Sequence, residues 1–229
     1  MGQAFSPPSY FDATWQSVFV AGCEAIGANP YDVAGLLLNE SQFNPSSVNS
    51  IGCVGLNQMC PGSQNFTSDY TPSQYTALTV SEQLPYVFEF WQNWLTQYGL
   101  LTISARDLYW LNFLPATYVP NSPDSYVIVD QNGVNSQYYS QNQGLDVGGT
   151  GQITAGDLYQ AILNTESNYP NTYLYLAEMI TLAGGPLAYL PWPYFAAASA
   201  AAGFVGFYAW KQWGGGRGKK LPAWVPSWA

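Results

Sequence analysis

The hydrophobic and polar positions of the chain follow a helical period over several separate stretches. Apolar residues recur three and four positions apart, which is the pattern of a helix with one buried face. The expected helices span residues 12–26, 30–40, 80–98, 105–114, 155–163 and 172–183. Residues 42–80 and 115–153 are rich in Asn, Ser, Gln and Gly, which predicts loops. One short apolar run, Val127–Val129, favours a strand, so the pattern predicts a mainly α body with long polar loops.

Local signals mark where several of these helices begin. Asp12 is expected to cap the first helix, and Asn29 places a capping residue before Pro30 at the first helical position of the second. A capping box needs Ser or Thr three residues before an acidic residue or Gln. That spacing occurs at Thr79–Glu82, Ser104–Asp107 and Thr154–Asp157.

The end of the chain differs from the rest. No charged residue occurs from Gly184 to Trp210, and aromatic residues flank an Ala-rich run in the way that interfacial belts flank a membrane helix. Residues 193–213 are long and apolar enough to cross a bilayer. The alternative is an Ala-rich helix buried within a protein assembly.

These patterns divide the chain into five segments. We expect an N-terminal segment with a helix (1–28), a helical domain (29–170), a connecting helix and linker (171–192), a transmembrane helix (193–213) and a basic, Gly-rich and Pro/Trp-rich tail (214–229).

Composition narrows the possible functions. Charged residues make up 8% of the chain, against about 25% in average soluble proteins, and aromatic residues make up 17%, which excludes a disordered chain. All fourteen acidic residues, but only one basic residue, Arg106, lie before residue 186. Such a body has no basic surface for nucleic acid. The absence of histidine excludes Ser-His-Asp and Cys-His catalysis and histidine zinc sites.

The three cysteines, Cys23, Cys53 and Cys60, show no CxxC spacing. An odd number without a framework pattern favours small buried thiols, although one pair remains able to form a disulfide.

Glu40 is the residue with the strongest candidate chemistry. It follows the apolar residues Leu36–Leu38 at the end of an expected helix. A carboxyl group in that position is partly desolvated when it faces a cleft. Desolvation raises its pKa and keeps it protonated near neutral pH, as a general acid requires.

The residues around Glu40 resemble the soluble lytic transglycosylase family, which has a lysozyme-like fold. Leu36–Pro45 (LLLNESQFNP) is similar to that family's helix-ending Glu-Ser-x-Phe-x-Pro motif. Gly52–Met59 (GCVGLNQM) is similar to its Gly-x-x-Gly-Leu-x-Gln motif, at the usual distance from the glutamate. Asp107–Ala116 and Gly144–Leu158 resemble features of phage virion-associated members. The sequence departs from the family at Asn57, where a hydrophobic residue is usual, and it has no clear Ala-Tyr-Asn motif.

The resemblance implies a peptidoglycan lytic transglycosylase that uses one carboxyl group and no cofactor. Glu40 would protonate the glycosidic oxygen between N-acetylmuramic acid and N-acetylglucosamine, and the product would carry a 1,6-anhydro ring. Ser41, Asn57 and Gln58 would position Glu40 and the sugar, and Tyr118 is the best substitute for the missing motif's tyrosine. A lysozyme-like hydrolase is the variant. It needs a second carboxylate, and Asp32 lies about 12 Å away by helical rise, too far for a retaining pair.

Asp146–Asp157 has the frame of a calcium-binding EF-hand loop, with Gly151 at the sixth position. Gly148 and Thr150 replace two of its usual ligands. We therefore expect no metal, with Asp146 and Asp157 as weak candidate ligands, and interpret the segment as a turn followed by a capped helix.

The expected setting is a phage virion. The first residues show no secretion signal, so a wall-cleaving enzyme would reach its substrate by delivery with a virion. The expected partners are peptidoglycan, a virion membrane through the C-terminal helix, and other virion proteins, with cleavage at the host cell wall aiding genome entry. Two alternatives are a structural virion protein with a weakly active or inactive lysozyme-like domain, and a bacterial membrane-anchored wall-remodelling enzyme.

Overall fold

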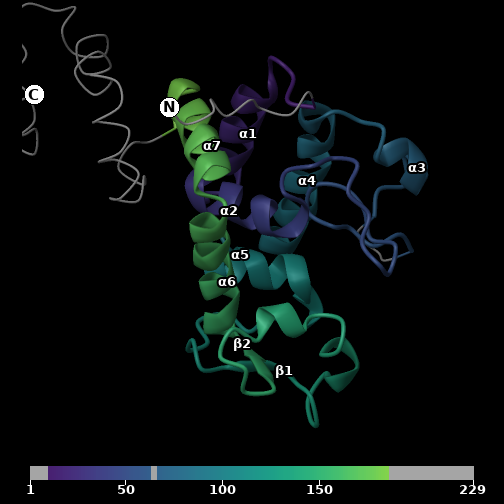
Figure 1. Ribbon diagram of the computed structural model, residues 1–229, viewed down its shortest axis with the longest axis vertical. Coiled ribbons are helices and arrows are strands. Elements are labelled where there is room, and N and C mark those ends of the chain that lie inside the picture. The colour runs from purple at the N-terminus through teal and green to yellow at the C-terminus, as the bar shows by residue number, and fades with distance from the viewer. Residues whose placement is uncertain (1–9, 63–65, 186–229) are drawn as a thin grey trace, which may run out of the picture. The chain divides into compact units, whose positions relative to one another are not determined.

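The computed structural model describes residues 10–62 and 66–185, and this part of the chain is mainly helical (Figure 1). Its α-helices are α1 (Trp15–Ala25), α2 (Pro30–Ser41), α3 (Pro72–Tyr75), α4 (Val80–Tyr98), α5 (Ala105–Phe113), α6 (Ala155–Asn168) and α7 (Pro170–Leu182). Two short strands, β1 (Val127–Asp130) and β2 (Gln152–Thr154), and three short 3-10 turns lie between α5 and α6. The sequence prediction of a mainly α body with long loops is confirmed.

Helix α2 is the centre of the fold. It packs against α1, α5, α6 and α7, and its residues Val33–Leu38 are all buried. A helix that is apolar on all sides is stable only when other helices cover it. In Figure 1, α6 and α7 follow one another end to end, with β1 and β2 at the start of α6. This packing includes α1 and α7, so the expected boundaries after residues 28 and 170 do not divide the described fold.

An aromatic cluster holds α1 against α4 and the end of α2. The ring of Phe19 lies 5.8 Å from that of Phe43 and 6.0 Å from that of Phe88, and Phe88 packs edge-on against Trp91. Trp91 is fully buried, as are Val87 and Leu95 of the same α4 stripe. The stripe along α4 is therefore core, as its spacing predicts.

Most of the expected helix starts are confirmed. The Asn29 side chain accepts a hydrogen bond from the backbone N–H of Tyr31, with Pro30 at the first position of α2. The boxes at Thr79–Glu82 and Thr154–Asp157 both form reciprocally. Helix α6 runs five residues beyond its predicted end at Leu163, because its last turn also buries Glu166 against α2.

One of the predicted caps is wrong, and one predicted capping box forms only in part. At Ser104–Asp107 only the Ser104 side chain caps α5, because the Asp107 carboxylate pairs with Arg106 at 2.8 Å instead of returning to the helix start. The residue before α1 is Thr14, not Asp12. The Asp12 carboxylate accepts hydrogen bonds from the backbone N–H groups of Thr14 and Ser81, so it joins the start of α1 to the first turn of α4.

The β1 strand forms as predicted, and it pairs antiparallel with β2, which the periodicity missed. Val129 lies opposite Ile153, and both are fully buried. Three residues are too few to show an alternating pattern, so only the pairing identifies β2.

None of the helices within the described residues is long and apolar enough to cross a membrane. The expected transmembrane helix at 193–213 and the tail at 214–229 lie outside the described residues.

Candidate active site

Glu40 lies in the last turn of α2, where a sharp change of backbone direction ends the helix. Gln42 and Phe43 both adopt left-handed conformations, with φ values of 55° and 61°. Non-glycine residues rarely adopt this conformation, and burial of the Phe43 ring in the aromatic cluster offsets its cost here. The turn leaves Glu40 half-buried at the edge of the core.

Burial raises the pKa of Glu40 to about 7. The hydroxyl of Tyr109 hydrogen-bonds to the Glu40 carboxylate and by itself lowers this pKa, but burial has the larger effect. Tyr109 lies on α5, and its hydroxyl also accepts a hydrogen bond from Nδ2 of Asn39. Oδ1 of Asn39 accepts a hydrogen bond from Thr165 on α6 at 2.5 Å. Residues from three helices thus orient the Glu40 carboxyl group, and its pKa suits proton transfer near neutral pH.

No second carboxylate acts on Glu40 within the described part of the chain, where Tyr109 is the single side chain that shifts its pKa. The buried Glu166 on α6 interacts instead with Asp32 near the start of α2. Burial raises the pKa of Glu166 to about 7, Tyr173 lowers it by hydrogen bonding, and the charge of Asp32 raises it further. Glu166 lies against Gly35, where an added Cβ would come within 2.7 Å of its Oε1. Glu40 is therefore the half-exposed carboxyl group of the described residues whose pKa is raised to about 7.

The Gly52–Met59 segment forms a closed loop. The backbone N–H of Val54 donates to the carbonyl oxygen of Met59 at 2.9 Å, and Gly55 has a left-handed φ of 79°. A Cβ on Gly55 would lie 2.5 Å from the ring of Tyr75 and 2.7 Å from Oε1 of Gln83, so no larger residue fits.

The side chain of Gln83, on α4, hydrogen-bonds to this loop and has no exposed surface. Its Oε1 accepts a hydrogen bond from the backbone N–H of Leu56 at 3.0 Å. Its Nε2 donates to the carbonyl oxygens of Pro45 and Tyr75, each at 2.8 Å. The sequence analysis missed Gln83, although a glutamine among the apolar positions of a helix was the available signal.

A disulfide joins Cys53 to Cys60 and encloses the same loop. The expectation of buried thiols is therefore wrong for these two cysteines and confirmed for Cys23, which is free and buried. The hydrogen bond between Val54 and Met59 brings the flanking cysteines together. The spacing of cysteines along the sequence cannot predict such a contact.

Reduction of this disulfide should destabilise the protein. A cross-link closing eight residues removes chain entropy from the unfolded state worth about 2.5 kcal/mol. Thermal unfolding with and without a phosphine reductant measures the effect, and we expect a lower Tm in the reductant. A Cys53→Ala/Cys60→Ala variant should have the lower Tm, and the reductant should not change it. Equal melting of the oxidised and reduced wild type would contradict the expectation.

The four predicted sugar-binding residues differ in their placement. Ser41 is buried, and its hydroxyl donates to the carbonyl oxygen of Leu37 within α2, so it makes no described contact with Glu40. Gln58 is half-buried, and its Nε2 donates to the carbonyl oxygen of Gly55 at 2.9 Å. Gln58 therefore shapes its own loop.

Asn57 is only 2% exposed and faces Asn112 of α5. Its Nδ2 donates to Oδ1 of Asn112, and Nδ2 of Asn112 donates back to the Asn57 carbonyl oxygen. Within the described residues, Oδ1 of Asn57 accepts no hydrogen bond. Asn57 stands where the family that the sequence resembles usually has a hydrophobic residue. Its polar partner on α5, Asn112, explains the difference.

Tyr118 does not reach Glu40. Its ring packs edge-on against Tyr98 and Trp110, with centroid distances of 5.0 and 5.4 Å. Tyr109 is the tyrosine beside Glu40, and the sequence analysis did not select it. The role of Tyr118 as a sugar contact stays a prediction.

The Asp146–Asp157 loop uses its carboxylates internally. Asp146 accepts hydrogen bonds from the backbone N–H groups of Thr150 and Gly151 and from the hydroxyl of Tyr139, all within 3.0 Å. Asp157 accepts from the backbone and hydroxyl of Thr154 as part of the cap of α6. In residues 10–62 and 66–185, no three His, Cys, Asp or Glu side chains are grouped closely enough to hold a metal ion.

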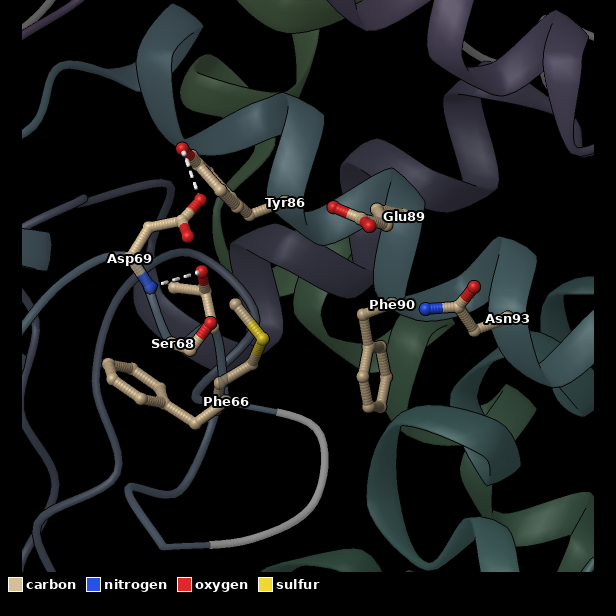
Figure 2. Close-up of a pocket in the computed structure, with 9 residues that line it drawn as sticks. Phe66, Ser68, Asp69, Tyr86, Glu89, Phe90 and Asn93 are labelled. Atoms are coloured by element: carbon tan, nitrogen blue, oxygen red, sulfur yellow. Dashed lines mark hydrogen bonds between the residues drawn. The ribbon is translucent and has the colours of Figure 1, made fainter.

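A pocket with a volume of about 220 Å³ opens between the loop after Met59 and the outer side of α4 (Figure 2). It is lined by Met59, Phe66, Thr67, Ser68, Asp69, Tyr86, Glu89, Phe90 and Asn93. Figure 2 shows Asp69 of the loop next to Tyr86 of α4, to which a hydrogen bond joins it. Glu40 does not line this pocket, but a chain of contacts connects them: Tyr109 contacts Glu40, and Asn112, one turn further along α5, contacts Asn57, two residues before Met59.

Comparison with protein-family models, curated proteins and solved structures finds no match to the chain.

Proposed function

We propose that the chain is a peptidoglycan lytic transglycosylase with a lysozyme-like domain, and that Glu40 is its catalytic residue. The observation that carries this proposal is the half-buried Glu40 carboxyl group, with a pKa of about 7 and a tyrosine hydroxyl as its neighbour. The two linked motifs around Glu40 and Gly52–Met59 support the substrate class through their resemblance to the family, and Gln83 hydrogen-bonds both segments, at Pro45 and Leu56.

One carboxyl group suffices for the reaction. Protonated Glu40 donates its proton to the glycosidic oxygen as the bond from that oxygen to C1 of N-acetylmuramic acid breaks. The carbonyl oxygen of the substrate's own N-acetyl group bonds to C1 and stabilises the positive charge, which is a known exception to the two-carboxylate rule. The Glu40 carboxylate then accepts the proton of the C6 hydroxyl as O6 bonds to C1 and displaces the acetamido oxygen. The products are a 1,6-anhydro sugar and a new chain end, and no water is consumed.

The neighbours of Glu40 contribute by position. Tyr109 holds the carboxyl group in one orientation, and Asn39 and Thr165 hold the hydroxyl of Tyr109. Asn57 and Gln58 shape the loop beside the site, Asn57 through its bond to Asn112 and Gln58 through its bond to the carbonyl oxygen of Gly55.

The cellular setting is also part of the proposal. A virion carries the enzyme, the 193–213 helix anchors it in a virion membrane beside other virion proteins, and cleavage opens the host wall for genome entry. The uncharged, apolar C-terminal run of the sequence supports the membrane anchor.

Product analysis tests the proposed function. The full-length chain in mild detergent is incubated with purified peptidoglycan, and the soluble products are read by mass spectrometry. We expect muropeptides with 1,6-anhydro ends. Reducing-end muropeptides would show hydrolysis and a second catalytic carboxylate. No release by a folded protein would overturn the enzymatic proposal and favour a structural virion protein.

The pH dependence gives a second test. Because Glu40 must be protonated in the free enzyme, kcat/KM should fall as the pH rises through about 7. The Tyr109 hydroxyl lowers the pKa of Glu40, so Tyr109→Phe should move this alkaline limb to higher pH. Tyr98→Phe, which removes a hydroxyl bonded to the carbonyl oxygen of Pro115, is the control and should leave the limb in place. An unchanged limb in Tyr109→Phe would contradict the role given to this hydroxyl.

A further inference from the structure

The pocket beside α4 combines aromatic walls with acidic edges. Its lining includes an apolar base of the buried Phe90 and Met59, 8% and 5% exposed, and the aromatic residues Phe66 and Tyr86. Asp69 and Glu89 are exposed at its edge, on the loop and on α4 respectively. Thus an apolar chain would fit against the base while a polar end group meets the carboxylates.

The charge of the pocket is not neutralised by the described part of the protein. Arg106 is the one basic residue there, and it makes both of the ion pairs found in residues 10–62 and 66–185, with Asp107 and Asp124. Within the same residues, Asp69 accepts only a long hydrogen bond, 3.4 Å, from the hydroxyl of Tyr86. Two carboxylates beside aromatic rings attract a cation by charge and through the ring faces.

We propose that this pocket binds a primary ammonium group carried on an aliphatic chain, the group that a peptidoglycan stem peptide bears on its uncross-linked diamino acid. This inference rests on the proposed function, which supplies the peptide as the source of the amine. Met59 of the pocket lies two residues from Asn57, whose partner Asn112 is one turn of α5 from Tyr109, the neighbour of Glu40. The proposal places the sugar at Glu40 and the end of the stem peptide in the pocket.

Other ligands fit the pocket less well. A phosphate or a free carboxylate would face two negative side chains without a neighbouring base. A metal ion would need more ligands than the described carboxylates supply. A sugar ring can stack on the aromatic residues, but it leaves the charge of Asp69 and Glu89 unmatched, so a sugar alone is an outcome of the test.

The test measures binding to the full-length Glu40→Gln protein, which cannot turn over the ligand. Calorimetry compares a soluble stem peptide with a free lysine amine, the same peptide acetylated on that amine, and a chitin tetrasaccharide. We expect acetylation to weaken binding about tenfold, the effect of losing one charged hydrogen-bonded contact. An added Asp69→Asn/Glu89→Gln pair should remove the difference between the two peptides.

Controls separate this inference from folding and from the proposed function. Added Glu24→Gln, which removes an exposed acid of α1, should preserve the tenfold preference, and thermal unfolding should show that every variant is folded. Equal binding of both peptides, or binding of the tetrasaccharide alone, would overturn the inference even if the wild type cleaves peptidoglycan. A preference for the free amine in a protein that cleaves nothing would support the pocket and overturn the proposed function.

Discussion

Glu40→Gln should lower the rate of anhydromuropeptide release about a thousandfold or more, because a positioned general acid contributes roughly two to four orders of magnitude. Glutamine keeps the size and most of the hydrogen bonding of glutamate but carries no transferable proton. The measurement is the initial rate of product release from insoluble peptidoglycan at pH 6, below the pKa of about 7.

The same substitution should stabilise the protein above pH 7. The pKa of Glu40 is higher in the folded than in the unfolded chain, so ionisation favours the unfolded state as the pH rises from about 4.5 to about 7. Glutamine never ionises, and Glu40→Gln should therefore raise the free energy of unfolding at pH 8 by roughly 1–3 kcal/mol, with a much smaller gain at pH 4. Loss of activity with gain of stability distinguishes a functional residue from a structural one.

Glu166→Gln is the matched control for Glu40→Gln. Glu166 has a raised pKa of about 7 for the same main reason, burial, but it lies in the α2–α6 interface beside Gly35. We expect this variant to retain activity. Equal losses of activity in the two variants would contradict the catalytic role of Glu40. The loss would then come from replacing any buried carboxyl group, whatever its position in the fold.

Gln83→Leu should destabilise the fold by roughly 3–5 kcal/mol, the largest stability effect we expect. Leucine has a similar volume but leaves two buried backbone groups without partners, the N–H of Leu56 and the carbonyl oxygen of Pro45. The carbonyl oxygen of Tyr75 loses one of its two hydrogen bonds and keeps the one from the backbone N–H of Leu78. Each unsatisfied buried group costs about 1–3 kcal/mol. Chemical denaturation of the full-length protein measures the change.

Gln92→Leu is the control for this prediction. Gln92 lies on the same helix, and its side chain is exposed. Its replacement should change the free energy of unfolding by no more than about 0.5 kcal/mol. Similar effects at both positions would show that the loss comes from α4 itself and not from the loop that Gln83 supports.

Interactions within one helical turn could be predicted from sequence. The Asn29–Pro30 start of α2 and the boxes at Thr79 and Thr154 depend on side chains within three residues of one another. The buried stripe of α4 follows from its period, since a helix must bury its apolar face somewhere. The position of Glu40 at the end of α2 belongs to the same group.

The errors share a different cause. Asp12 and Asp107 have the residue type of helix caps, but each has a competing partner, Ser81 and Arg106, that the local pattern does not weigh. Tyr109 was missed because the packing of α5 against α2 decides which side chain meets Glu40. The Cys53–Cys60 disulfide likewise depends on how the enclosed loop folds back.

The sequence by itself thus determined the helices, most of their starts, and Glu40 as the candidate acid, because these depend on spacing along one element. The tertiary structure decided what surrounds that acid. It placed Tyr109 against the carboxyl group of Glu40. It brought Asp32 close enough to Glu166, and not to Glu40, to raise that residue's pKa, and it bonded the Gly52–Met59 loop to Gln83. A pKa depends on burial and on neighbours from other helices, and the packing of α2 against α5 and α6 creates both.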